Sequence, residues 1–417
     1  MLRQLETSRS IAEAVALCRP EVVCAYPITP QTHIVEGLAE FVREGRLRPC
    51  EFLNVESEFA ALSVAIGASA TGARAYTATA SQGLLFMAEA VYNASGLGFP
   101  IVMTIGNRAI GAPINIWNDH SDSMALRDAG WMQLFASTAQ EAADLHIVAF
   151  RLAEELSCPV MVCVDGFVLT HSYEAVDLPV QEQVDAFLPR YEPRQVLDPA
   201  IPVSVGAMVG PEAFTEVRYL AHQKQLRALD LLPELSRDFA NIFSRPCGAL
   251  ISPYRTDGAN TIVVALGSVN GTIQDVVDEM REAGRSIGSI SVGCYRPFPM
   301  CAVAEATAQA SRIVVIDRSL APGMGGILAA DVHMATQSNP VRIFSVIAGL
   351  GGRPITRSSL RRVFETAMDD ALGQLTFLDL QTELIERHLE RERKMWNTGP
   401  AAENILYDIQ RIAAEIG

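Results

Sequence analysis

Lysine and paired cysteines are what this sequence has least of. Lysine occurs only at positions 224 and 394, so few side chains could form a Schiff base with a carbonyl substrate. The eight cysteines are scattered, with no C-x-x-C pair and no companion histidines at metal-ligand spacing. We therefore expect buried free thiols, and we assign no iron–sulfur, zinc or other metal site to this chain alone.

Long apolar runs are also missing. The stretches 59–73 and 90–107 carry no charge, but they contain Gly, Ser, Asn or Pro, so neither is typical of a membrane span. The N-terminus has no apolar block followed by a small-residue cleavage site, so we expect a cytoplasmic location. The net charge of −15 argues against nucleic acid as a partner, because neutralising phosphates requires clustered Lys and Arg.

The chain does contain enough apolar sequence for two or three globular domains, with 417 residues of which 49% are hydrophobic. From 1 to 180, strand-like segments alternate with helical patterns, which predicts an α/β domain with a parallel sheet. The predicted strands are "VVCAYP", "EFLNVE", "RAYTATA", "PIVMTI" and "CPVMVCVDG". In such sheets, ligands bind at the loops that follow the carboxyl ends of the strands.

Three further regions follow along the chain. Residues 181–258 are rich in proline and predict a crossover and linker that wrap the first domain. Residues 259–375 alternate again, with strands "TIVVALG", "IGSISVGCY", "RIVVIDRS" and "VRIFSVIAG", and predict a second α/β domain. Residues 376–417 form a charged helical tail, which either is a solvated helix or docks on a partner through Met395 and Trp396.

The first candidate functional segment is "YPITP", which follows the first of these strands. Pro30 restricts Thr29 to an extended conformation and Pro27 fixes its own φ, so the Thr29 hydroxyl is held in one direction. A simpler interpretation is that Thr29 caps the next helix.

The second segment, "NVESEFAALSVAIGASATGA", places Glu56 and Glu58 where a strand becomes a helix, with Ser57 as a plausible N-cap. Acidic residues here could merely complement the helix dipole. The helix that follows carries mostly small side chains and permits close packing, so Glu58 should be largely buried. A buried carboxyl group holds its proton more readily and can donate a hydrogen bond.

Two more polar loops follow strands. "TATASQGL" opens a helix whose free N–H groups suit an anion or a polar ring edge. "TIGNRAIGAPINIWNDHSD" offers Arg108 for a carboxylate. Its Asp119, His120 and Asp122 could suggest a metal site, but three adjacent ligands in one loop rarely have suitable geometry. No G-x-S-x-G motif indicates a serine hydrolase, and "PGMGG" (322–326) is not a dinucleotide-binding fingerprint.

Taken together, these segments resemble the alpha subunit of the 2-oxoacid:ferredoxin oxidoreductases, the family that includes pyruvate:ferredoxin oxidoreductase. The likeness covers nearly the whole chain and rests on the order of "YPITP", "ESEFAA", "TASQGL", "RAIGAP", "NDHSD", "DGF" (165–167), "RPFP" and "IDRS". It implies a thiamine-diphosphate-binding domain of the pyrimidine type, followed by a domain like the C-terminal domain of transketolase.

The resemblance also implies roles for individual residues. Glu58 matches the glutamate that hydrogen-bonds N1′ of the cofactor's aminopyrimidine, and Thr29 and Arg108 match residues that meet the carbonyl and carboxylate of the substrate. These three residues are the expected catalytic set. Further cofactor contacts are expected from Pro27, Ile28, Ser81 and Gln82, and further substrate contacts from Gln31, Trp117, Asn118 and Asp119.

Several features of the single-chain family members are missing from this chain. It has no G-D-G segment for the diphosphate's magnesium and no cluster cysteines. The resemblance therefore implies beta, gamma and delta partner subunits, which would hold Mg²⁺ and iron–sulfur clusters and serve coenzyme A, and an active site at the alpha–beta interface. This subunit alone should be inactive. A flavoprotein subunit that passes electrons to NAD is a further partner to consider.

The substrate stays open at this point. Gln31 and Thr32 follow the turn where pyruvate enzymes often have small serines, and Trp117 either packs outside the pocket or faces an aromatic substrate such as phenylglyoxylate. Phenylglyoxylate and pyruvate rank above oxalate, branched-chain 2-oxoacids and 2-oxoglutarate. The alternatives to an enzyme subunit are a non-catalytic scaffold of the same complex and a stand-alone NAD-dependent dehydrogenase, which the missing Gly-rich fingerprint disfavours.

Overall fold

The computed structural model describes residues 2–339 and 341–416. Its first sheet has seven strands in the order β12-β6-β7-β5-β4-β2-β3. All neighbours are parallel except β12, which is antiparallel to β6. The strands are β2 (Val22–Ala25), β3 (Glu51–Asn54), β4 (Ala75–Thr79), β5 (Val102–Asn107), β6 (Met132–Phe135), β7 (Val160–Asp165) and β12 (Cys294–Arg296). The predicted parallel-sheet α/β fold is confirmed.

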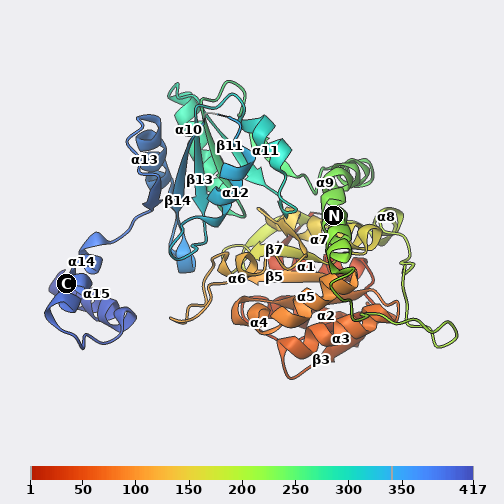
Figure 1. Ribbon diagram of the computed structural model, residues 1–417. Helices are drawn as coiled ribbons and strands as arrows, with labels where there is room; N and C mark the ends of the chain where they lie inside the picture. The colour runs from red at the N-terminus through yellow and green to blue at the C-terminus, as the bar shows by residue number, and fades with distance from the viewer. Residues whose placement is uncertain (1, 340, 417) are drawn as a thin grey trace.

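Helices cover both faces of this sheet (Figure 1). One apolar core joins the strands to α1 (Thr7–Leu17), α2 (Thr32–Arg43) and α7 (Ala139–Leu156). A second core lies on the other face, with α3 (Glu58–Ala70), α4 (Ser81–Phe86) and α5 (Ala88–Leu97). The short helix α6 (Ser121–Ala125) lies in the loop after β5, and β1 (Leu2–Glu6) pairs antiparallel with β8 (Tyr173–Asp177).

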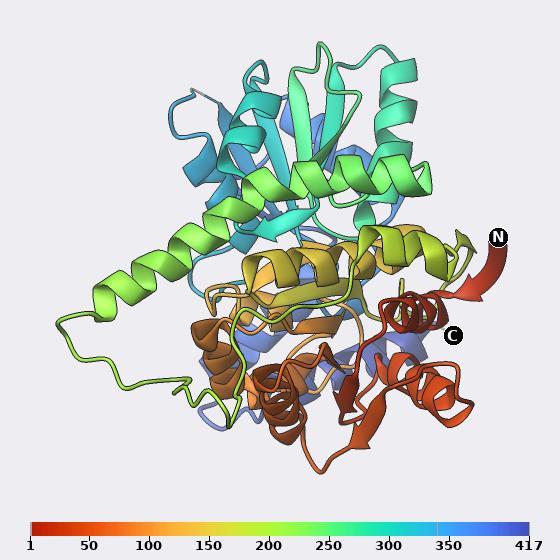
Figure 2. The ribbon, with the colours of Figure 1, turned by 90° about the vertical axis from the view of Figure 1, so that its right-hand side faces the viewer.

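The segment between the sheets wraps the first domain and then crosses it. Backbone Leu197 donates to the Ala70 carbonyl at 2.8 Å, and the Gln195 side chain reaches the Leu97 carbonyl. The helices here are α8 (Gln181–Phe187) and the 30-residue α9 (Phe214–Phe243), whose aromatic rings at Phe187 and Phe239 lie 5.4 Å apart. Figure 2 shows α9 lying across the junction of the two domains, with its N-terminal end projecting beyond them.

The second sheet has six strands in the order β15-β14-β13-β10-β11-β9 and is parallel except for β9. Its strands are β9 (Ile251–Tyr254), β10 (Thr261–Ala265), β11 (Ile287–Val292), β13 (Arg312–Asp317), β14 (Arg342–Ile347) and β15 (Leu375–Phe377). Its helices are α10 (Val269–Glu282), α11 (Met300–Thr307), α12 (Ile327–Ala335), the 3-10 turn η1 (Leu350–Gly352) and α13 (Arg357–Met368).

One expected strand, "IGSISVGCY", is divided between the two sheets. β11 belongs to the second sheet and β12 to the first, and Gly293 separates them. A Cβ at Gly293 would lie 2.4 Å from the Ala249 carbonyl oxygen, so glycine permits this close approach. The core on the α3–α5 side also includes Ile262, Leu328 and other side chains of the second domain. The apolar core on the α3–α5 side therefore extends from the first domain into the second.

The tail is helical, as predicted, and consists of α14 (Thr382–Lys394) and α15 (Ala401–Ile416). Arg391 joins the two helices through a 2.9 Å ion pair with Asp408. Figure 1 shows both helices standing away from the two domains. Trp396, between them, is fully exposed.

Of the eight free cysteines, six are buried, Cys50 is half-buried and Cys301 is exposed, which largely agrees with the expected buried thiols. In the described part of the chain, no helix has the length and hydrophobicity that a membrane span requires.

Candidate functional site

Four predicted segments meet at one edge of the first sheet. They follow β2, β3, β4 and β5, which are neighbours in the order β5-β4-β2-β3. Because these strands are parallel, their carboxyl ends lie at the same edge. Arg108, after β5, donates from Nη1 to the Thr29 carbonyl, after β2, at 3.0 Å. The structure thus brings the segments of Thr29, Glu58, Ser81 and Arg108 together.

The buried side chain of Gln31 stabilises the turn after β2. This side chain is fully buried, and its Nε2 donates to the Tyr26 carbonyl at 3.1 Å. Gln31 is also the N-cap residue of α2, so the interpretation of Thr29 as that helix's cap is wrong. Thr29 and Pro27 are exposed and Ile28 is half-buried, so the turn presents them toward the open edge while Gln31 stabilises its shape.

Glu58 is buried at the start of α3, as predicted. Ser57 caps this helix, accepting from backbone Ala60 at 3.2 Å, and Glu58 is only 7% exposed. A Cβ on Gly83 would lie 2.6 Å from Glu58 Oε1 and 2.7 Å from Thr79 Oγ1. Within the described residues no hydrogen bond reaches the Glu58 carboxylate, and the buried Thr79 hydroxyl has no partner either. A fully buried hydroxyl group without a partner, as at Thr79, is rare without a ligand or water.

The loop after β4 is conformationally strained at Ser81. This residue has φ +51°, a left-handed conformation that is costly for a non-glycine residue. It is held there because its backbone N–H donates to Asp122 at 2.9 Å and its hydroxyl donates to the Ala109 carbonyl at 2.5 Å. Gln82 lies beside Gly111, where a Cβ would be 2.6 Å from Gln82 Nε2.

Asp122 joins the loops after β4 and β5, a role that the sequence analysis missed. Its Oδ2 accepts from the backbone of Ser81 and of Arg108, and its Oδ1 accepts from Asn107 and from backbone Ser123, all within 3.0 Å. Burial raises the pKa of Asp122 to about 6, although these hydrogen bonds oppose the shift. The sequence shows an acidic residue in a polar loop, but its partners become visible only in the fold.

Arg108 presents a buried guanidinium group without a carboxylate partner. It is 7% exposed, and its Nε and Nη1 donate to the carbonyls of Asn115 and Thr29. Burial lowers the pKa of Arg108, an effect that the Asp122 carboxylate opposes, and the guanidinium stays charged at neutral pH. No ion pair reaches Arg108 from the residues described, so its remaining donors suit an incoming carboxylate.

The rest of the loop after β5 faces the second domain. The ring centroids of Trp117 and Phe167 are 4.8 Å apart. A Cβ added to Gly352 would lie 2.4 Å from the Cβ of Trp117. Asn118 is fully buried, and neither atom of its side-chain amide has a partner among the described residues, while its carbonyl accepts from backbone Gly352 at 2.7 Å. Asp119 accepts from backbone Ser121 and, at 3.3 Å, from backbone Gly351.

A buried ionic network fixes this loop to the second domain. Asp165, at the end of β7, contacts His120 Nε2 at 2.7 Å, Arg318 Nη1 at 2.9 Å and backbone Ser268 at 2.9 Å. Burial alone would raise the pKa of Asp165, but Arg318 and His120 hold it well below its usual value. His120 and Asp122 thus serve separate networks, and among the described residues they form no metal cluster with Asp119.

Comparison with known proteins places this site in a family. Residues 13–233 match the sequence model of a family described as pyruvate flavodoxin/ferredoxin oxidoreductase, thiamine diphosphate-binding. Residues 259–360 match pyruvate:ferredoxin oxidoreductase core domain II. In the solved structure of 2-oxoglutarate:ferredoxin oxidoreductase from Magnetococcus marinus, the same fold covers 87% of this chain and 65% of that one, with 16% identity and a TM-score of 0.69.

Curated relatives are much closer in sequence. Pyruvate synthase subunit PorA of Methanosarcina barkeri is 44% identical over 390 residues, which cover 91% of this chain and 97% of the relative. PorA of Thermotoga maritima is 42% identical, with 88% and 94% covered, and ketoisovalerate oxidoreductase subunit VorA of Pyrococcus abyssi is 39% identical, with 85% and 90% covered. The chain therefore belongs to the 2-oxoacid:ferredoxin oxidoreductase family and is an alpha subunit with that family's thiamine-diphosphate-binding domain.

Proposed function

We propose that this subunit holds the aminopyrimidine of thiamine diphosphate through Glu58 in a complex that oxidatively decarboxylates pyruvate with coenzyme A to acetyl-CoA and CO2, with the two electrons passed to iron–sulfur clusters on partner subunits. The observation that carries the proposal is the buried Glu58 carboxylate, which has no partner among the described residues and lies beside Gly83 and the unpartnered Thr79 hydroxyl. When bound, thiamine diphosphate supplies a nucleophilic carbon for attack on a 2-oxo group.

The residues at this edge fit the aminopyrimidine half of the cofactor. A carboxyl group in a largely buried site can share a proton with a ring nitrogen. Thr79 offers a hydroxyl group, and Gly83 leaves space that any side chain would fill. Pro27, Ile28, Ser81 and Gln82 are the further contacts we propose around that ring. The diphosphate and its Mg²⁺ are assigned to a partner beta subunit.

For the substrate, we propose that Arg108 binds the carboxylate and that the Thr29 hydroxyl meets the 2-oxo group. The buried guanidinium without an ion pair and the exposed turn support these roles. Pyruvate is favoured because several relatives are named pyruvate synthase subunits. The packing of Trp117 between Phe167 and Gly352 supports a place outside the pocket and gives no support to phenylglyoxylate. Asn118 and Asp119 are proposed to shape the pocket wall.

Exposed apolar side chains on the elements that carry or follow the site support coverage by a partner. Tyr26, Leu53, Phe59, Phe86 and Tyr92 are each more than a third exposed and belong to β3, to the turn after β2 or to helices α3–α5. Exposed apolar groups near a polar site are typical of interfaces. We propose that the beta subunit covers this edge, that gamma and delta subunits complete the complex with iron–sulfur clusters, and that the alpha subunit alone is inactive. A flavoprotein subunit is needed only if NAD is the acceptor.

The test uses the complete complex, assayed with CoA and an artificial electron acceptor on pyruvate, 2-oxoisovalerate, phenylglyoxylate and 2-oxoglutarate. Pyruvate should give the highest kcat/KM. Glu58→Gln should lower turnover at least about 100-fold, since general acid–base groups contribute about 10²–10⁴-fold. Glu56→Gln is the matched control, because Glu56 is exposed two residues away.

Two other outcomes would contradict parts of the proposal. A complex of Glu58→Gln subunits with normal turnover would favour the scaffold hypothesis, in which Glu58, Thr29 and Arg108 are all replaceable. A preference for phenylglyoxylate would overturn the substrate assignment while leaving the role of Glu58 intact.

A further inference from the structure

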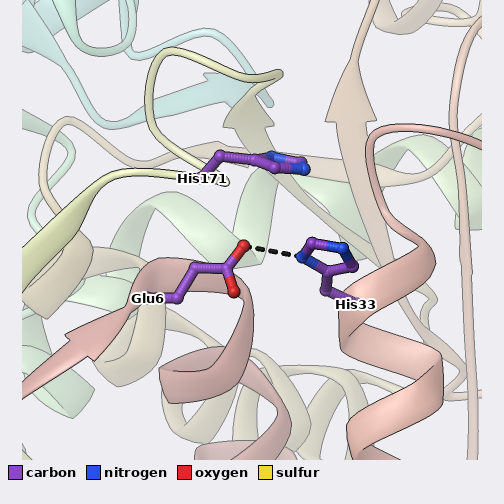
Figure 3. A group of neighbouring side chains, drawn as sticks. All are labelled: Glu6, His33 and His171. Atoms are coloured by element: carbon purple, nitrogen blue, oxygen red, sulfur yellow. Dashed lines mark hydrogen bonds and ion pairs between the residues drawn. The ribbon is translucent and has the colours of Figure 1, made fainter.

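Two histidines and a glutamate meet on the surface beside the turn that carries Thr29. Glu6 ends β1, His33 lies in the first turn of α2, and His171 lies in the loop between β7 and β8. Figure 3 shows the Glu6 carboxylate and the His33 ring facing each other, with the His171 ring above them. One ligand atom from each residue lies within 4.8 Å of the other two. Nothing in the proposed reaction uses these three side chains.

The chemistry of the cluster matches a transition metal. Two imidazoles and one carboxylate are a ligand set that zinc accepts, with ligand distances near 2.0–2.2 Å and neighbouring ligand atoms about 3.3 Å apart in a tetrahedron. Glu6 Oε1 and His33 Nδ1 are now 2.7 Å apart, and the two histidine rings have centroids 4.8 Å apart. Small shifts of these side chains would therefore make room for a metal ion among the three ligand atoms.

The surroundings of His171 already fix its ring. Its Nδ1 lies 2.8 Å from Thr170 Oγ1, which itself accepts from backbone Phe167 at 2.8 Å. In the tautomer that carries its proton on Nδ1, this nitrogen donates to Thr170 Oγ1 and the lone pair of Nε2 is left for a metal. A second-shell hydrogen bond of this kind is usual for metal-binding histidines.

We propose that Glu6, His33 and His171 form a zinc site that holds the start of α2 to the loop after β7. His33 is exposed and the other two side chains are half-buried, so a water molecule can complete a tetrahedral set. The site connects two parts of the candidate active site. On one side, α2 follows the Thr29 turn directly, and on the other, Phe167 packs against both His171 and Trp117.

The experiment measures zinc in the full chain without a histidine tag, after saturation with ZnSO4 and removal of free metal. We expect about one zinc per chain by elemental analysis, and a visible absorption spectrum when Co²⁺ replaces it. His33→Ala and His171→Ala should each weaken binding at least tenfold, since even second-shell changes cost about 10–100-fold. His333→Ala is the matched control because His333 is exposed on α12, outside the cluster.

Further measurements distinguish a variant that lacks a zinc ligand from a variant that is unfolded. Circular dichroism should show the same helix content in all variants, and Glu6→Gln, which keeps the side-chain shape, should also weaken zinc binding. Zinc should raise the Tm of the wild type but not of His171→Ala. The proposal is overturned if the wild-type chain retains no zinc, or if folded His33→Ala and His171→Ala chains bind it as tightly as the wild type.

Discussion

At the residue scale, buried acids with several donors hold the site in shape. Asp165 is the clearest case, because it belongs to the first domain while its partners Arg318 and Ser268 belong to the second. The Arg318 side chain is itself buried. Removing one partner from such a pair leaves an uncompensated charge, and this costs about 3–5 kcal/mol.

Asp165→Asn should therefore lower the free energy of unfolding by about 3–5 kcal/mol at pH 7. The folded-state pKa of Asp165 lies below its unfolded value, so its stabilising contribution is complete above about pH 4 and is lost as pH falls further. Urea titrations between pH 3 and 8 would measure the difference from wild type, which should shrink only in the acid range. Asp275→Asn, at an exposed position on α10, should change little.

The sequence predicted single residues well where the signal is local. The Ser57 cap and the buried Glu58 follow from residue types at a strand-to-helix junction, and both are confirmed. Asp122 and Asp165 were not identified as organisers because, apart from Ser123 beside Asp122, the partners named here lie 14 to 153 positions away in the chain. Gln31 was expected to contact substrate. Its side chain is buried and donates to the Tyr26 carbonyl, which supports a role in stabilising the turn. Its contact with substrate stays a prediction.

At the element scale, the close approach of α4 to α3 determines the room available at Glu58. Gly83 in α4 lies against the Glu58 carboxylate and the Thr79 hydroxyl. A methyl group there would collide with both, so the helix and the carboxylate could not keep their present positions.

Gly83→Ala should reduce turnover of the assembled complex at least tenfold, because the added Cβ would lie 2.6 Å from Glu58 Oε1 and displacing a positioned catalytic group is costly. Steady-state kinetics of the complex would measure the loss. Gly271→Ala is a matched control in helix α10, since no atom lies within 4 Å of its Cβ. That control should keep full activity and gain up to about 1 kcal/mol of stability.

The element pattern was predictable to the extent that hydrophobic alternation is visible. β2, β3, β4 and β7 lie in predicted segments, and β5 extends two residues beyond its segment "PIVMTI". β6 was missed because four apolar-rich residues between polar loops give no clear period. The helix that "TATASQGL" was expected to open is divided into α4 and α5, with Met87 between them outside helical geometry. Nothing local could show that β12 joins the other sheet, since strand pairing is a long-range choice.

At the scale of the whole molecule, the two domains are connected through the loop after β5. Besides the Asp165 network, Asn115 donates to the Gly351 carbonyl at 3.1 Å, and Trp117 lies against Gly352. The substrate loop is thus supported by the second domain, although the second domain supplies none of the proposed catalytic residues.

Gly352→Ala should disturb this support. Gly352 has φ +82°, and a Cβ there would lie 2.4 Å from Trp117 Cβ. Gly323→Ala is the matched control, because Gly323 has φ +83° with nothing within 4 Å. Both variants carry the same backbone cost, so the collision alone should make Gly352→Ala about 1–3 kcal/mol less stable than Gly323→Ala in thermal or urea unfolding. Equal stabilities would contradict the proposed contact.

The exposed apolar side chain on α4, the helix beside Glu58, gives a prediction about assembly. Phe86 is 61% exposed on α4, and burying such a side chain in an interface contributes about 1.5–3 kcal/mol. Phe86→Ser should therefore weaken association with the beta subunit roughly tenfold or more, as measured by size-exclusion chromatography and calorimetry. Met334→Ser, at a 52% exposed position on α12, should leave association unchanged if the second domain's outer face is free.

The pairing of β12 with β6 has a consequence for how this chain can be divided. A polypeptide that ended between the two domains would contain every proposed catalytic residue, yet its seven-stranded sheet would lose β12 and leave the outer side of β6 unpaired. Exposed strand edges recruit other strands. The first domain made alone should thus be prone to edge-to-edge aggregation, and any gene split or fusion that preserves a soluble subunit must keep residues 294–296 attached to it.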